Sequence, residues 1–242
     1  YRRQRQMCIR DSFTDLKLTG ELSKIGIGGQ WGTFANNTQI TTCDLTEVTG
    51  WGTTPTLPEL AFANCTALQE VTLPDDMKVI GTGAFSGCAA LTTVNLSQVT
   101  WINLNAFYEC TSLEMLILDN VTEIGREVFY GCTSLKTLKI PKCTRFGNYI
   151  VTGCKALTRI EATATGDFLD IIGNSSIENY AVFHNRDTHS GENAFAPARC
   201  DLVLNTDKQE DGTAVPKVSG NNRWTLAANA SPMMWKNITF RQ

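Results

Sequence analysis

A repeat of about 22 residues constrains the fold of this chain more than any other feature. Four successive copies begin with AFANC, AFSGC, AFYEC and VFYGC, at Ala61, Ala84, Ala106 and Val128. They are 23, 22, 22 and 22 residues long. A degraded copy follows at Ile150, and an earlier one begins at Thr33. Self-similarity at a fixed period predicts a solenoid in which each copy forms one coil.

Each copy combines a strand-like part with a tight turn. The pattern Leu-x-x-Val-x-Leu, as in Leu68, Val71 and Leu73, ends in an alternation of period two, which predicts a short strand with one buried face. A further apolar residue, such as Ile102, is expected to turn inward again. In Phe-x-x-Cys the two side chains fall on one side of a single helical or 3₁₀ turn. Glycines before the Cys, such as Gly87, suit a tight bend.

One coil alone cannot fold, because its few apolar side chains do not offset the entropy of ordering its backbone. Stacked coils bury side chains above and below and pair their strands at about 4.8 Å. The expected fold is therefore a stack that is stable only as a whole.

The repeat Ile-Gly-x-x-Ala-Phe-x-x-Cys-x-x-Leu-x-x-Val-x-Leu-Pro resembles the BspA-type (Treponema pallidum-type) bacterial leucine-rich repeat, closely over residues 61–161. The segments at 201–205 and 234–240 are similar to the closing region of such proteins in gut Bacteroidetes. The resemblance implies a right-handed leucine-rich-repeat solenoid of short parallel β-strands, 3₁₀ or helical turns and irregular connections. This would be a β-rich α/β fold capped at both ends. It also implies a secreted or surface-anchored bacterial protein that acts in adhesion or in host or matrix binding, and it supplies no catalytic residues.

The predicted organisation has four parts. Residues 1–12 contain four arginines and resemble translated sequencing-adapter read-through, so we interpret them as a non-native extension. An amino-terminal cap with a degenerate repeat is expected over 13–60, and the leucine-rich repeats over 61–165. An irregular segment and capping strands are expected over 166–242. The predicted location is extracellular or at the outer cell surface, with the signal sequence outside this chain.

Charge and hydropathy bear on the partners. The net charge of −3 offers no basic excess for nucleic acid or an anionic membrane. No apolar stretch approaches the roughly 20 residues that a transmembrane helix needs. We therefore expect no nucleic-acid partner. The partner that the resemblance implies is a host or matrix protein, with a surface glycan as the alternative, and we expect a monomer.

The cysteines follow the repeat. Five of the nine share one repeat position, namely Cys65, Cys88, Cys110, Cys132 and Cys154. Cys43 and Cys143 align with valines elsewhere in the repeat. We predict an interior ladder of reduced, structural thiols without metal or cofactor. The alternative is a ladder that is partly oxidised or binds zinc, although the chain has no Cys-x-x-Cys pair.

The two histidines, His184 and His189, lie in a polar segment that we predict to be a solvated loop. The alternative is a metal site, or an acid–base pair with Asp187. Five-residue spacing does not place both rings on one helix face, and no nucleophile is marked nearby.

Period two turns a second set of strand residues outward, and these are the candidate binding residues. They form two columns that read Thr42 and Asp44, Glu70 and Thr72, Thr93 and Asn95, Met115 and Ile117, Thr137 and Lys139, Arg159 and Glu161. Met115 and Ile117 are apolar among polar neighbours, as at the centre of an interface, although scattered exposed apolar residues are also ordinary. On the opposite surface, the residue that follows the Phe position of each copy forms a separate row, namely Ala63, Ser86, Tyr108, Tyr130 and Thr152. The two tyrosines either contact a ligand or, as we favour, pack together.

Three functions remain open at this point. The first is a non-enzymatic binding protein that uses the outward strand face. The second is a β-solenoid that acts on or binds polysaccharide, and an enzyme of this kind needs clustered carboxylates that the outward columns lack. The third is the recognition arm of a larger protein whose catalytic domain is missing from this chain.

Overall fold

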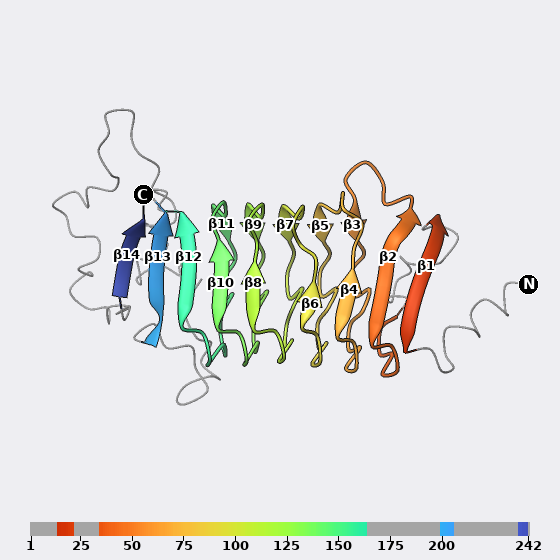
Figure 1. The fold of residues 1–242 in the computed structure, drawn as a ribbon, viewed down its shortest axis with the longest axis horizontal. Helices are drawn as coiled ribbons and strands as arrows, with labels where there is room; N and C mark the ends of the chain where they lie inside the picture. The colour runs from red at the N-terminus through yellow and green to blue at the C-terminus, as the bar shows by residue number, and fades with distance from the viewer. Residues whose placement is uncertain (1–13, 22–33, 164–198, 206–236, 242) are drawn as a thin grey trace, which may run out of the picture.

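The computed structural model describes residues 14–21, 34–163, 199–205 and 237–241, and these form a solenoid of stacked coils (Figure 1). All neighbouring strands are parallel. No α-helix forms within residues 34–163. The predicted solenoid of short parallel strands joined by turns is confirmed.

The first side of the solenoid, which we call the strand face, carries two sheets. One has the order β1-β2-β4-β6, and the other β14-β13-β12-β10-β8. The bounds of the first are β1 (Asp15–Glu21), β2 (Thr42–Thr49), β4 (Glu70–Thr72) and β6 (Thr93–Val94). Those of the second are β8 (Met115–Ile117), β10 (Thr137–Ile140), β12 (Arg159–Thr163), β13 (Asp201–Asn205) and β14 (Asn237–Arg241).

Another side carries a continuous sheet of two-residue strands, which we call the second sheet. Its strands are β3 (Thr56–Leu57), β5 (Val79–Ile80), β7 (Trp101–Ile102), β9 (Glu123–Ile124) and β11 (Arg145–Phe146). Their second residues stand in register, and all but the half-buried Phe146 are buried. The sequence predicted an inward apolar residue here, and the structure adds that its backbone pairs from coil to coil.

The Phe-x-x-Cys segments form single turns. In the second copy, the Cys88 N–H donates to the Phe85 carbonyl at 3.1 Å. The residue between them, Gly87, has a φ of 75°, and Asn64 and Glu109 reach similar positive values at the same repeat position. This left-handed residue stops the chain from winding into a helix, and it suits glycine best.

The core centres on a stack of five phenylalanine rings. Neighbouring centroids lie 5.1, 5.5, 5.2 and 6.0 Å apart, along Phe34, Phe62, Phe85, Phe107 and Phe129. All five side chains are buried. Offset stacking of buried rings adds to their hydrophobic burial, so this stack ties each coil to the next.

The Ile-Gly step after the second sheet allows the coils to approach closely. A Cβ on Gly125 would lie 2.6 Å from the Leu104 nitrogen in the preceding coil, which is closer than real contacts allow. The same step at Gly81 would bring a Cβ 2.5 Å from the Leu57 carbonyl oxygen. Glycine is therefore required here for close backbone approach.

Candidate binding face

The outward columns predicted from the sequence lie on the strand face in ladder register. In the first column Glu70 is paired with Thr42 and Thr93, and Thr137 with Met115 and Arg159. In the second column Lys139 lies between Ile117 and Glu161, and Asp44 pairs with Thr72. The structure brings these residues together within each sheet, but no pairing joins β6 to β8 in the described coils.

Asn95 lies outside the second column's ladder. Its side-chain amide donates to the Leu73 carbonyl at 2.9 Å and accepts from the Leu73 N–H at 2.6 Å. The side chain thus takes the place that a strand backbone would hold beside β4. β6 ends at Val94, and both polar atoms of the Asn95 side chain are hydrogen-bonded within the protein.

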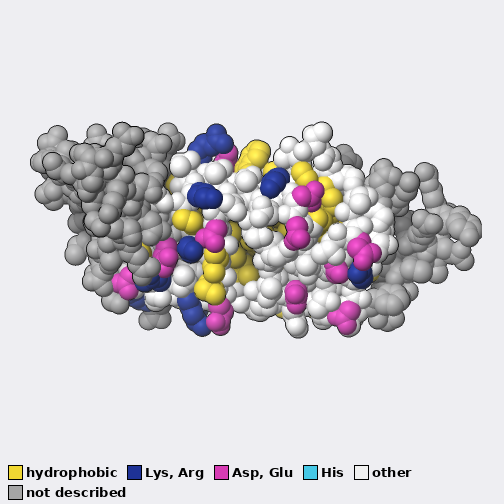
Figure 2. All heavy atoms as spheres, turned by 45° about the horizontal axis from the view of Figure 1, so that its top comes forward, with side chains coloured by type: hydrophobic (Ala, Val, Ile, Leu, Met, Phe, Trp, Pro, Cys, Tyr) yellow, Lys and Arg dark blue, Asp and Glu magenta, His cyan; other side chains and the backbone are white. Residues whose placement is uncertain are grey.

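Two apolar side chains stand out on this face. Met115 is 59% exposed and Ile117 is 47% exposed, whereas Leu116 between them is buried. Figure 2 shows exposed hydrophobic side chains near the middle of the described surface, with further hydrophobic surface set back beside them. Exposed apolar groups of this size, side by side, are typical of an interaction site.

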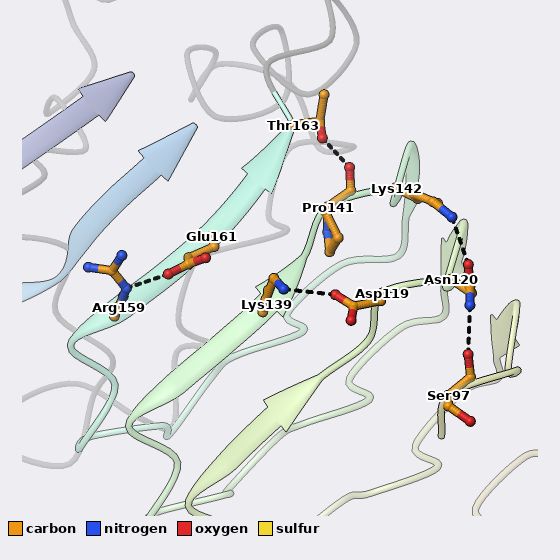
Figure 3. A network of polar contacts seen from close by, with 9 residues as sticks. All are labelled: Ser97, Asp119, Asn120, Lys139, Pro141, Lys142, Arg159, Glu161 and Thr163. Atoms are coloured by element: carbon orange, nitrogen blue, oxygen red, sulfur yellow. Dashed lines mark hydrogen bonds and ion pairs between the residues drawn. The ribbon is translucent and has the colours of Figure 1, made fainter. Parts of the chain in front are cut away.

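Ion pairs border this apolar spot on its carboxyl-terminal side. Glu114 contacts Lys136 at 2.8 Å, and Asp119 contacts Lys139 at 3.0 Å. Figure 3 shows the second of these pairs together with the Arg159–Glu161 pair, at 2.6 Å on β12. Exposed pairs of this kind add little stability, so they act here as a polar rim.

The amino-terminal part of the face is polar. Lys17 on β1 contacts Glu47 at 2.7 Å and Asp44 at 3.7 Å. Hydrogen bonding to Glu47 raises the pKa of Lys17, and the hydrogen bonds from Thr46 lower the pKa of the Asp44 carboxyl. These charges are mutually satisfied, so this region offers less for a partner than the apolar spot on β8.

The tyrosine row behind the Phe stack is a packing contact. The Tyr108 and Tyr130 rings stack with centroids 4.6 Å apart and planes 2° apart. Tyr130 is buried, and burial is the main cause that raises the pKa of Tyr108. The two tyrosine rings therefore pack against each other, as we favoured from the sequence.

The five ladder cysteines are free thiols with fully buried side chains. Each Sγ donates to a Phe carbonyl of the preceding coil, at 2.9 to 3.2 Å. Burial raises the pKa of Cys65 to about 11 and that of Cys132 to about 12. Such thiols stay protonated and unreactive at neutral pH. The repeat position indicated burial but gave no signal for the hydrogen bond.

The described residues contain no group of three or more His, Cys, Asp or Glu side chains that could hold a metal ion. His184 and His189 lie outside these residues. Nor does the described part of the chain include a helix long and apolar enough to cross a membrane.

A second exposed apolar spot lies on and just after β7, where Trp101 and Leu104 are each 41% exposed. Neither residue was predicted from the sequence to be exposed. Period two across Trp101 and Ile102 would have turned the indole outward once β7 was recognised as a strand.

Comparison with known proteins agrees with this architecture. The family model described as BspA type Leucine rich repeat region matches residues 30–163 in six copies. No curated protein gives a significant match. The chain spans about half the length of three similar proteins of known structure.

Similar solved structures come from several bacteria. A Treponema pallidum leucine-rich repeat protein is 27% identical with a TM-score of 0.47, covering 50% of this chain and 58% of its own. A leucine-rich cell surface protein of Faecalibacterium prausnitzii is 24% identical with a TM-score of 0.47, covering 63% and 48%. A leucine-rich repeat protein of Bacteroides ovatus is 27% identical with a TM-score of 0.36, covering 52% and 41%.

Proposed function

The chain belongs to the BspA type leucine-rich repeat family, and from this premise we propose that it is a non-enzymatic binding protein, secreted or held at the outer cell surface. Its partner is a host or matrix protein, and the binding surface is the strand face. The columns through Glu70, Thr93, Thr137 and Arg159, and through Thr72, Lys139 and Glu161, supply the polar surroundings of the contact.

The exposure of Met115 and Ile117 on β8 is the observation that carries this proposal. Two large apolar side chains in water gain free energy when a partner covers them, at about 25 cal/mol per Å². A polar rim of paired charges lies beside them. The buried Phe stack and the second sheet hold this surface in one shape, so binding loses little entropy in ordering it.

A pair of matched double variants tests the proposal. Met115→Asp with Ile117→Asp places two charges on β8, and Trp101→Asp with Leu104→Asp places two charges at the other apolar spot. The probes are immobilised collagen, fibronectin and mucin, with binding measured by biolayer interferometry. We expect the β8 variant to lose about thirtyfold or more in affinity, as for a hot spot of about 2 kcal/mol. The control variant should bind like the parent.

Equal binding by the parent and the β8 variant would show that the partner does not bind at the strand face. The non-enzymatic assignment has its own test, in which the protein is incubated with plant and mucosal polysaccharides and the release of reducing ends is measured. Any turnover that purified protein sustains would contradict it.

A further inference from the structure

The boundary between β6 and β8 lacks the hydrogen bonds that join neighbouring coils elsewhere on the strand face. At five other boundaries two consecutive N–H groups donate to one carbonyl of the preceding coil. The donors and acceptors are Thr41 and Thr42 to Thr14, Gln69 and Glu70 to Thr41, Thr92 and Thr93 to Gln69, Lys136 and Thr137 to Glu114, and Thr158 and Arg159 to Lys136. By this pattern Glu114 and Met115 would donate to Thr92, and no such bond forms among the described residues.

The unpaired groups on β8 can be identified from its pairing with β10. Glu114 accepts from Thr137 N at 3.4 Å, and Leu118 N donates to the Lys139 carbonyl at 2.9 Å. Alternate residues of a parallel strand turn their N–H and C=O groups to opposite neighbours. Met115 and Ile117 therefore direct these groups towards β6, with which β8 does not pair. The residues with the exposed side chains are also those with the open backbone edge.

The interruption is local and is held by its surroundings. Thr111 donates to the Ala89 carbonyl at 3.1 Å before β8, and Asn120 donates to the Ser97 carbonyl at 2.7 Å after it. In the same two coils β7 pairs with β9, and the Phe85 and Phe107 rings stack. Figure 1 shows a wider interval between β6 and β8 than between β8 and β10.

The core is less well covered on the β6 side of the boundary, whereas Leu116 on the β8 side is buried. Val94 on β6 is only half-buried, whereas Val71 and Leu138 at the same position of paired coils are buried. Figure 2 shows recessed hydrophobic surface beside the exposed apolar side chains of this region. The boundary thus combines an apolar floor with unpaired main-chain donors and acceptors.

An open strand edge with this chemistry is matched by another extended backbone, because only a backbone offers alternating N–H and C=O groups at the right spacing. We propose that the β6–β8 boundary docks an extended segment of a partner protein, which adds to the edge of β8. Its main chain pairs with Met115 and Ile117, and its apolar side chains cover theirs. This proposal rests on the proposed function, because it names how the strand face binds.

The paired length is short, because β8 has three residues and the bonds from Thr111 and Asn120 close the boundary at either end. A segment of similar length therefore supplies the main-chain bonds, and the residues that flank it extend into solvent. A single side chain can pair one residue, as the Asn95 amide does with Leu73, whereas one extended backbone can pair both Met115 and Ile117.

Selection of linear peptides tests the proposal. Random 12-residue peptides displayed on phage are selected on the parent protein and counter-selected on Met115→Asp with Ile117→Asp, with Trp101→Asp and Leu104→Asp as the matched control. Each selected peptide is then synthesised with single N-methyl groups along its backbone. We expect N-methylation at alternate positions to weaken binding about tenfold or more. At the positions between them, N-methylation should change the affinity little.

Amide hydrogen exchange in the bound protein gives a second readout. Met115 and Ile117 should gain protection with peptide, while Leu116 and Leu118, already paired with β10, should change little. The inference is overturned if no peptide depends on β8, if every N-methyl position is tolerated, or if bound peptide leaves Met115 and Ile117 unprotected. Should a matrix protein still need Met115 and Ile117 in those cases, the proposed function stands without it. If that matrix protein binds equally well without Met115 and Ile117, the proposed function is contradicted instead.

Discussion

Two sides of the same coils differ in continuity. The second sheet pairs without interruption from β3 to β11, and the buried Phe rings stack through five coils. The strand face is built from the same repeats, yet its ladder breaks between β6 and β8. Two continuous contacts are therefore enough to hold the coils together, which leaves the strand face able to vary.

The cause lies in which positions repeat. The Ile-Gly step and the Phe-x-x-Cys turn recur with nearly the same residues, and each recurrence makes the same contacts. The outward positions of the strand face differ from coil to coil. Asn95 is the example with the largest consequence, because its amide replaces backbone pairing with Leu73.

Removing one ring should damage the continuous side most. Phe107 is fully buried between Phe85 and Phe129, so Phe107→Ala leaves a cavity and weakens two coil interfaces. We expect the free energy of unfolding to fall by about 3 to 5 kcal/mol in urea denaturation. The comparison variant is Met115→Ala on the strand face, whose loss should stay within about 0.5 kcal/mol because the side chain is exposed. A similar loss of unfolding free energy for both variants would show that the two sides do not differ in this way.

A second pair of variants compares two asparagines that bond to the preceding coil. Asn95→Ala leaves the Leu73 N–H and C=O without the partner they now share, at a cost of about 1 to 3 kcal/mol. Asn103→Ala, just after β7, removes one bond to the Ile80 carbonyl, but the Asn103 backbone N–H still donates to that oxygen at 3.0 Å. Its loss should therefore be smaller in the same urea assay. The reverse order would show that Asn95 does not cap β4.

Alkaline pH should weaken the continuous side gradually. The ladder thiols have pKa values raised by burial, for example to about 12 for Cys132, whereas an unfolded thiol ionises near 9. Folded thiols keep their protons and unfolded ones lose them, so stability is retained below pH 9 and falls as pH rises towards 12.

Cys132→Ala provides the comparison. Each buried thiol contributes up to about 1.4 kcal/mol per pH unit in that window, so this variant should show a shallower fall of unfolding free energy between pH 9 and 11. Ellman's reagent should react with the ladder thiols only after unfolding. Parallel pH profiles for the parent and Cys132→Ala would contradict the account of the ladder.

The repeat allowed the solenoid, its short parallel strands and its turns to be predicted, because these features recur in every coil. The pairing of the second sheet was not predicted, since two-residue strands leave only one apolar position in the sequence. Trp101 was missed for the same reason.

The candidate site was predictable only in part. Alternation places Met115 and Ile117 outward, and the structure exposes both. The Asn95 side chain bonds to the Leu73 backbone 22 residues away, and no local pattern indicates that contact or the break between β6 and β8. Similarly, the Phe-x-x-Cys spacing gives no indication that the Cys thiol donates to a carbonyl of another coil.

Amide hydrogen exchange in the free protein, measured by NMR, distinguishes a strand face that is interrupted between β6 and β8 from a continuous one. The N–H groups of Thr93 and Thr137 are bonded to the preceding coil on the strand face, and that of Glu123 is bonded in the same way on the second sheet. We expect slow exchange at these three amides and exchange on the order of a hundredfold faster at Met115. A Met115 amide that exchanges as slowly as those of Thr93 and Thr137 would show an unbroken strand face and contradict the account.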